Sequence, residues 1–151
     1  MIRLFLAFTS LLPLKTNHSF GSFVGYLLYL FNSEAKSVSK QNLEICFPGL
    51  SELELKSLLK KVLTETGKGL TESGLIWNQN FTDNAKLIRN INGEHYLDSS
   101  KKTILLVPHM GCWEITGRVL AEKRKVTFMY RPLRSNKQND YLFSRRRYVK
   151  I

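Results

Sequence analysis

The chain of 151 residues has only two cysteines, Cys46 and Cys112, and they form neither a metal-binding nor a disulfide pattern. A disulfide-stapled secreted domain is therefore excluded, and a reducing compartment is expected. Internal repeats and low-complexity tracts are also missing. With 43% hydrophobic and 23% charged residues, the chain is neither a disordered tail nor a polytopic membrane protein. Its length predicts one domain with a real core.

Acidic residues are scarce, with 12 Asp and Glu against 23 Lys and Arg, so the formal net charge is +11. The imbalance is greatest at the C-terminal end, where residues 118–151 hold eleven Lys and Arg but only Glu122 and Asp140 as acids. A basic surface of this kind favours an anionic partner: phospholipid headgroups, an acidic protein or nucleic acid. No nucleic-acid-binding motif is found, so no nucleic-acid partner is expected.

The N-terminal region lacks charge instead. "MIRLFLAFTSLLPL" has one Arg and no clear small-x-small cleavage site, and residues 16–33 are free of charged residues. Neither piece reaches the roughly 20 apolar residues that span a bilayer. Together they are consistent with one interrupted span, a hairpin dipping into one leaflet, an interfacial anchor or a buried core helix. We interpret residues 1–33 as an N-terminal membrane-associated hydrophobic segment and residues 34–151 as the single domain that follows it.

The rest of the chain predicts an α/β fold. Ser51 and Glu54 have the spacing of a capping box, and the apolar stripe that follows them indicates a helix. That stripe consists of Leu55, Leu58, Leu59, Val62 and Leu63. Strands are predicted from Lys86 to the Asn92–Gly93 turn, at 103–107 and at 126–130, with a short helical turn after Gly93. Helices are predicted at 112–122 and 136–148, so the order favours a partial sheet with parallel neighbours, flanked by helices.

The stretch "TILLVPHMGCWEITG" is the strongest candidate for chemistry. His109 and Glu114 can meet only if His109 lies on a turn after the strand and Glu114 lies in the first turn of the following helix. Pro108 and Gly111 favour that geometry. A carboxylate beside an imidazole stabilises the imidazolium and suits the histidine to general-base catalysis. In the alternative without catalysis, both residues have structural roles only: His109 ends a strand, and Glu114 interacts favourably with the dipole of the following helix.

The segment "HMGCWE" resembles the H-x4-(D/E) motif of the lysophospholipid acyltransferase superfamily. It is closest to the bacterial lipid A biosynthesis (lauroyl/myristoyl) acyltransferases, whose usual form is His-x-Gly-Asn-Trp-Glu. Four further segments agree in order: "QNLEICFPGLS" (41–51), "NGEHYL" (92–97), "YRPLRSNKQNDYL" (130–142) and "RRRY" (145–148). The resemblance covers nearly the whole chain, and the hydrophobic N-terminal segment is also expected in that family.

This resemblance implies an enzyme that transfers a fatty acyl chain from acyl carrier protein, or a coenzyme A thioester, to a hydroxyl of a lipid A precursor. His109 would be the general base and Glu114 would orient it. Arg131 would bind phosphate or stabilise the oxyanion. Arg145, Arg146 and Arg147 would bind substrate or carrier protein, or would form only a solvated helix face. No cofactor is implied, and the expected location is the cytoplasmic face of the inner (plasma) membrane.

Two departures from the family pattern raise alternatives. Cys112 stands where the family usually has Asn. A reactive thiolate there is not expected, because the dyad chemistry requires no nucleophile. A zinc site with His109 and Glu114 is not expected either, because no fourth ligand is apparent. Family members also continue well beyond the arginine-rich segment, which suggests a truncated product, a fragment or one half of a split pair. The alternative function is therefore a catalytically inactive remnant that only binds membrane lipid through its basic surface.

Overall fold

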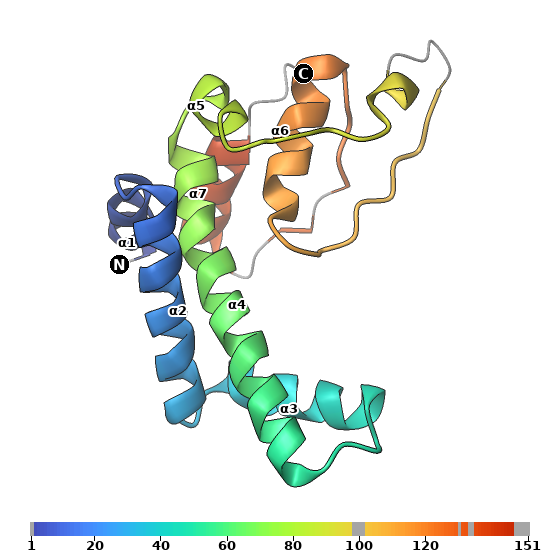
Figure 1. Cartoon of the computed structure of the whole chain (residues 1–151). Helices are drawn as coiled ribbons and strands as arrows, with labels where there is room; N and C mark the ends of the chain where they lie inside the picture. The colour runs from blue at the N-terminus through green and yellow to red at the C-terminus, as the bar shows by residue number, and fades with distance from the viewer. Residues whose placement is uncertain (1, 98–101, 130, 133–134, 147–151) are drawn as a thin grey trace.

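A computed structural model describes residues 2–97, 102–129, 131–132 and 135–146, and the regular secondary structure of these residues is helical (Figure 1). The helices, in chain order, are α1 (Ile2–Ser10), α2 (Leu14–Leu30), α3 (Glu34–Cys46), α4 (Glu52–Asn78), α5 (Phe81–Ala85), the 3-10 helix η1 (Glu94–Tyr96), α6 (Trp113–Lys123) and α7 (Asn136–Arg146).

The long helix α4 is the axis of the molecule. Its 27 residues extend about 40 Å at 1.5 Å per residue, and α1, α2, α3, α6 and α7 all contact it. The predicted capping box is confirmed, since Glu54 N–H donates to Ser51 Oγ and Ser51 N–H donates to Glu54 Oε2. The predicted apolar stripe is core as well: Leu59 and Leu63 are buried with Leu43 of α3, and Leu55, Leu58 and Val62 pack around them.

Helix α2 packs against α4 through glycine. A Cβ at Gly21 would lie 2.7 Å from Lys68 Cα, and a Cβ at Gly25 would lie 2.6 Å from Thr64 Cα. Such distances leave no room for any side chain, so the two backbones approach directly. Gly67 faces Gly21 and Gly25 from α4 in the same way. At these three glycines the interface is therefore built from close backbone contact.

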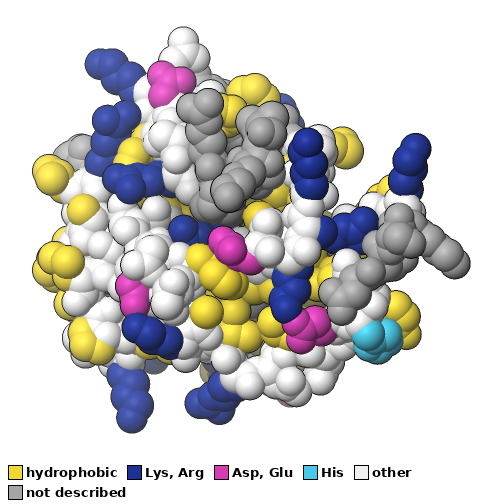
Figure 2. All heavy atoms as spheres, turned by 90° about the horizontal axis from the view of Figure 1, so that it is seen from above, with side chains coloured by type: hydrophobic (Ala, Val, Ile, Leu, Met, Phe, Trp, Pro, Cys, Tyr) yellow, Lys and Arg dark blue, Asp and Glu magenta, His cyan; other side chains and the backbone are white. Residues whose placement is uncertain are grey.

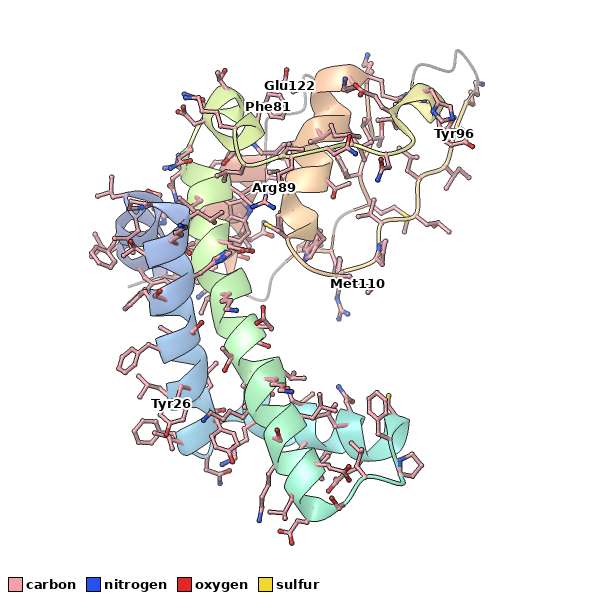
Figure 3. The ribbon with its side chains drawn as sticks, in the orientation of Figure 1. Tyr26, Phe81, Arg89, Tyr96, Met110 and Glu122 are labelled. Carbon is pink, nitrogen blue, oxygen red and sulfur yellow. The ribbon has the colours of Figure 1, made fainter. Side chains whose placement is uncertain are left out.

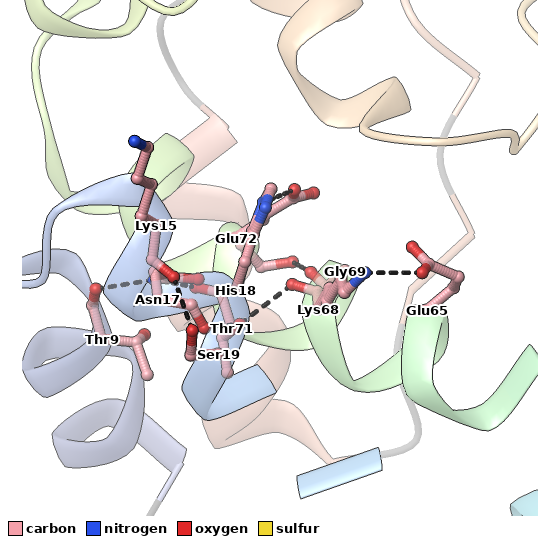
Figure 4. A network of polar contacts seen from close by, with 11 residues as sticks. Thr9, Lys15, Asn17, His18, Ser19, Glu65, Lys68, Gly69, Thr71 and Glu72 are labelled. Carbon is pink, nitrogen blue, oxygen red and sulfur yellow. Dashed lines mark hydrogen bonds and ion pairs between the residues drawn. The ribbon is translucent and has the colours of Figure 1, made fainter. Parts of the chain in front are cut away.

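Buried hydrogen bonds hold α1 and α2 to the same helix (Figure 4). Asn17 Nδ2 donates to Thr9 O at 2.9 Å and to Thr71 O at 3.2 Å, while Thr71 Oγ1 donates to Asn17 O at 3.3 Å. His18 of α2 also pairs with Glu72 of α4. Because Asn17 and Thr71 are fully buried, these bonds fix the relative positions of three helices.

The predicted α/β fold is wrong: the described residues contain no strand. The three predicted strands are irregular in the structure: residues 103–107, residues 126–129, and the residues from Lys86 to the Asn92–Gly93 turn. Residue 130, the last of one predicted strand, lies outside the described part. The 103–107 run is not buried either, because Ile104 and Leu106 are 91% and 90% exposed. Apolar, β-branched composition favours a strand, but a strand also needs a hydrogen-bonded neighbour, and none pairs with these runs among the described residues.

The helical predictions at the C-terminal end are confirmed. Cys112 is the N-cap of α6, which runs to Lys123, and α7 begins at Asn136 as predicted. Residues 147 and 148 of the predicted helix lie outside the described residues. The turn at Asn92–Gly93 is present, with Gly93 at φ +79° and η1 directly after it. The helices could be predicted because helix periodicity depends on residues within a few positions of one another. Strand pairing instead depends on a partner segment elsewhere in the chain.

The outer faces of α1 and α2 carry large apolar side chains. Leu4, Phe8 and Leu11 are 78%, 52% and 81% exposed, and Phe23 and Phe31 are 56% and 67% exposed. Figure 3 shows aromatic side chains projecting from the side of α2 that faces away from α4. We call this surface the outer apolar face. Within the described residues, no helix combines the length and the apolar character needed to cross a bilayer.

Lys and Arg side chains surround much of the molecule. In the view from above, they stand around most of the rim, with few Asp and Glu among them (Figure 2). Two of the lysines lie over tyrosine rings near the far end of α2: Lys60 Nζ is 4.9 Å from the Tyr26 ring centroid and Lys36 Nζ is 5.2 Å from that of Tyr29. The net positive charge of the sequence is thus displayed at the surface.

Candidate active site

The turn that leads into α6 carries His109. Pro108 and Met110 are joined by a backbone hydrogen bond, and Gly111 adopts φ +54°, a left-handed conformation that L side chains rarely adopt. The His109 side chain is exposed, and its ring lies against the Trp113 ring, with centroids 4.1 Å apart. The predicted placement of His109 on a turn before the helix is therefore correct, although the described residues before it form no strand.

Glu114 lies in the first turn of α6 and is only 9% exposed. Its Oε2 accepts a hydrogen bond of 3.2 Å from Trp77 Nε1 of α4. One turn later, Arg118 is buried and Nη1 donates to the main-chain oxygens of Ile76 and Gln79 at the C-terminal end of α4. These two side chains dock the start of α6 on the end of α4, and the partly exposed helix start is a favourable place for a negative group.

His109 and Glu114 are thus brought to the same end of α6, on either side of Trp113. Their described contacts go to different groups: the imidazole stacks on Trp113, while the carboxylate accepts from Trp77. Met110, which is 77% exposed, lies between them in the chain, on the turn below α6 in Figure 3. The site is consequently open on the His109 side and closed on the Glu114 side.

Cys112 is held as a neutral thiol. Burial raises its pKa to about 12, and the carboxylates of Glu72 and Glu114 add to the rise. A thiol with that pKa carries almost no thiolate near neutral pH, which argues against a nucleophilic cysteine. Among the residues that the structure describes, no three His, Cys, Asp or Glu side chains gather closely enough to hold a metal ion.

The predicted arginines lie on different segments of the chain. Arg131 is exposed on an irregular stretch after α6. Arg145 lies on α7, with its guanidinium carbon 5.4 Å from the centroid of the Tyr141 ring. Arg146 ends α7, but only its backbone is described, and Arg147 lies outside the described residues.

Three residues that the sequence did not single out support the site. Trp77 contacts Glu114, Glu72 faces Cys112, and Arg118 bonds to the end of α4. Trp77 and Glu72 are five residues apart on α4, and no local pattern links them to a motif nearly forty residues later. Of the three, only Arg118 could have been found from the sequence, because it stands four residues after Glu114 and so lies on the same helix face.

The chain matches known proteins along most of its length. The family model described as "Bacterial lipid A biosynthesis acyltransferase" matches residues 2–150. The chain is 31% identical over 124 residues to a lipid A biosynthesis lauroyltransferase of Escherichia coli (strain K12), which covers 80% of the chain and 40% of that protein. It is also 26% identical over 119 residues to a lipid A biosynthesis acyltransferase of Haemophilus influenzae, covering 76% of the chain and 37% of that protein.

A third relative is the lipid A biosynthesis palmitoleoyltransferase of E. coli (strain K12), which is 25% identical over 119 residues, 74% of the chain and 38% of that protein. No solved structure gave a significant match. The chain therefore spans about two fifths of the length of the curated relatives that it matches.

Proposed function

The chain belongs to the bacterial lipid A biosynthesis acyltransferase family, and on this premise we propose that it acts in transferring a fatty acyl chain from a thioester to a hydroxyl of a lipid A precursor. The observation that carries the proposal is the position of His109 and Glu114, on the turn and in the first turn of α6. Acyl carrier protein is the proposed donor, because a basic chain of net charge +11 attracts an acidic protein.

In the proposed reaction, His109 accepts the proton of the acceptor hydroxyl as the oxygen attacks the thioester carbonyl. A tetrahedral intermediate forms and collapses, the carbon–sulfur bond breaks, and the imidazolium returns its proton to the leaving thiolate. Glu114 stabilises the positive imidazole through its negative charge. Arg131 offers a guanidinium to phosphate or to the oxyanion. In this scheme the proton that leaves the hydroxyl is returned to the leaving thiolate, and no cofactor takes part.

We further propose that the protein works at the cytoplasmic face of the inner membrane, with the outer apolar face of α1 and α2 against the lipid. Support comes from the exposed Leu4, Phe8, Leu11 and Phe23. Lys60, which lies over the Tyr26 ring of α2, adds a positive charge to that helix. In water such a face is costly, whereas at a bilayer surface its burial is favourable.

The dyad is tested by substitution of His109 and its neighbours. His109→Ala should reduce acyl transfer by about 10²–10⁴-fold, the usual contribution of a general base. His95→Ala is the matched control, because His95 is an exposed histidine on η1, away from the motif. Cys112→Ser should retain most of the activity. Transfer from radiolabelled acyl carrier protein and acyl coenzyme A thioesters to a lipid A precursor is the measurement.

Full activity of the His109→Ala protein, or loss of activity in the Cys112→Ser protein, would overturn this mechanism. A second candidate function is a lipid-binding protein without turnover, which the outer apolar face favours. It predicts vesicle binding by the unmodified chain and no thioester consumption with either donor. The same preparation therefore separates the two functions.

A further inference from the structure

A cavity of about 640 Å³ lies between α1, the end of α4 and α7. Its walls include Arg3 and Leu4 from α1, Asn78 from α4, and Tyr141 and Arg145 from α7. Figure 1 shows α7 beside the upper part of α4, the same part that α1 packs against. Three segments far apart in the sequence thus meet around one hollow.

Two guanidinium groups of this cavity share one aromatic ring. The guanidinium carbon of Arg3 is 5.1 Å from the centroid of the Tyr141 ring, and that of Arg145 is 5.4 Å from it. Each positive group is attracted by the negative face of the ring. Both positive charges therefore lie beside one ring in the lining of the same hollow, where they repel one another.

Hydrogen bonds fix the walls around these charges. Arg3 Nη2 donates to Lys137 O at 3.1 Å, which ties α1 to the start of α7. Tyr141 Oη donates to Asn78 Oδ1 at 3.3 Å, which ties α7 to α4, and the tyrosine is only 9% exposed. The ring that positions both guanidinium groups is thus itself held in place.

The chemistry of the lining favours a phosphate. Arginine presents several N–H donors in a planar fork that fits phosphate oxygens, and two such groups match the charge of −1.5 to −2 that a phosphate monoester carries near pH 7. Asp140 contributes the one carboxylate among the described lining residues, so the cavity keeps a net positive charge. A bound anion would also relieve the repulsion between Arg3 and Arg145.

The surroundings favour a phosphate that belongs to a lipid. Leu4 lines the cavity and is also 78% exposed on the outer apolar face, so one helix turn presents both an apolar side chain and a guanidinium. Asn78 of the lining directly follows Trp77, which donates to Glu114. A lipid headgroup in the cavity would consequently be held by the same end of α4 that holds the catalytic motif.

We propose that the cavity between Arg3 and Arg145 binds the phosphate monoester of a membrane lipid, with the lipid chains directed toward the outer apolar face. The proposal deepens the proposed function, since it assigns an anchoring site for a phosphorylated lipid. It assigns a role to Arg3, which no motif indicated, and it gives Arg145 a lipid phosphate rather than a protein as its partner.

Vesicle binding by the full chain tests the proposal. Phosphatidylcholine vesicles containing phosphatidic acid, which has a phosphate monoester, are compared with vesicles brought to the same surface charge with phosphatidylglycerol. The unmodified chain should bind the phosphatidic acid vesicles at least fivefold more tightly. Arg3→Gln and Arg145→Gln should each remove that preference, and Arg145→Lys should retain only part of it because an ammonium lacks the planar fork.

Arg89→Gln is the matched control, because it removes one exposed guanidinium that is not in the lining. It should leave the preference intact. Soluble glycerol phosphate and inorganic phosphate are added as competitors; competition only at millimolar concentrations indicates that the lipid is the preferred source, and micromolar competition by the free ions would overturn the lipid assignment. Circular dichroism melts confirm that each variant is folded.

Equal effects of Arg3→Gln, Arg145→Gln and Arg89→Gln would also overturn the proposal, since they would indicate charge attraction alone. If phosphopantetheine displaces the protein at a concentration below that of the phosphatidic acid in the vesicles, the cavity would be assigned to the carrier protein instead. No acyl transfer takes place in this assay. A chain that transfers no acyl group but still prefers phosphatidic acid contradicts the proposed function and supports lipid phosphate binding in the cavity. A chain that transfers acyl groups but lacks the preference supports the proposed function and contradicts lipid phosphate binding in the cavity.

Discussion

At the scale of single residues, the environment of Cys112 decides its chemistry. The residue follows His109 by three positions and caps α6, a setting in which a thiol can become a nucleophile. Burial and the carboxylates of Glu72 and Glu114 act in the opposite direction and raise its pKa to about 12. The thiol therefore stays protonated, and the acyl chain passes directly from donor to acceptor in the proposed mechanism.

This predicts a large difference in alkylation between the two cysteines. At pH 8, iodoacetamide should modify the exposed Cys46 at least tenfold faster than Cys112, because a raised pKa lowers the thiolate fraction. Glu72→Gln should accelerate modification of Cys112, since the Glu72 carboxylate contributes to the rise. Glu65→Gln is the control: this acid also lies on α4 but pairs with Lys68 at the surface. Mass spectrometry of the digested protein gives both rates. Equal rates for the two cysteines would restore the alternative in which Cys112 is a reactive thiolate.

At the scale of helices, the packing of α2 on α4 inverts the usual arrangement. Small residues such as Gly21, Gly25 and Gly67 are inside, and large apolar residues such as Phe23 are outside. Membrane helices pack in this way, because lipid covers the large side chains while small residues allow the backbones to approach. The Gly21-x3-Gly25 spacing is visible in the sequence and was the available signal for this interface.

Gly25→Ala should destabilise the protein by about 1–3 kcal/mol or more, because a Cβ there would lie 2.6 Å from Thr64 Cα in a rigid neighbouring helix. Gly69→Ala is the matched control, since it is also a helical glycine but has open space around it. That change should stabilise the helix by about 0.5–1 kcal/mol. Urea unfolding followed by circular dichroism measures both. Equal effects of the two changes would show that α2 and α4 are not in close contact in solution.

At the scale of the whole molecule, apolar and basic surfaces occur together. The outer apolar face lies on α1 and α2, and Lys and Arg side chains stand around most of the rim in the view of Figure 2. An interfacial protein uses both: apolar side chains enter the acyl boundary, and cations attract anionic headgroups. Because the net charge is +11, the protein is attracted to anionic headgroups. The packing of the helices decides where the positive side chains lie on the surface.

Phe8→Ser, Leu11→Ser and Phe23→Ser together should reduce binding to phosphatidylglycerol-containing vesicles by at least tenfold in a flotation assay, because each removes apolar area that enters the lipid. Leu53→Ser with Ile45→Ser is the control: both side chains are about as exposed, at 79% and 78%, but lie outside the outer apolar face. Raising the salt concentration should weaken the electrostatic part only. Unchanged flotation of the triple variant would remove the outer apolar face as the docking surface.

The sequence by itself determined the helices α4, α6 and α7, the turn at Asn92–Gly93, the turn before α6 and the family. The capping box at Ser51 and Glu54, the stripe through Leu59 and Leu63, and the start of α6 depend on neighbours within a few residues, so their patterns are complete in the chain. The spacing of His109 and Glu114 is likewise local, which is why the order of turn and helix could be predicted.

Tertiary structure alone decided which segments pair and which are covered. The runs at 103–107 and 126–129 have the composition of strands but lie exposed and irregular, because strand formation depends on a partner that composition does not specify. The contacts of Trp77 with Glu114 and of Arg3 with Tyr141 join residues 37 and 138 positions apart. Such contacts follow from how helices pack on α4, and packing is a property of the folded chain rather than of any short segment.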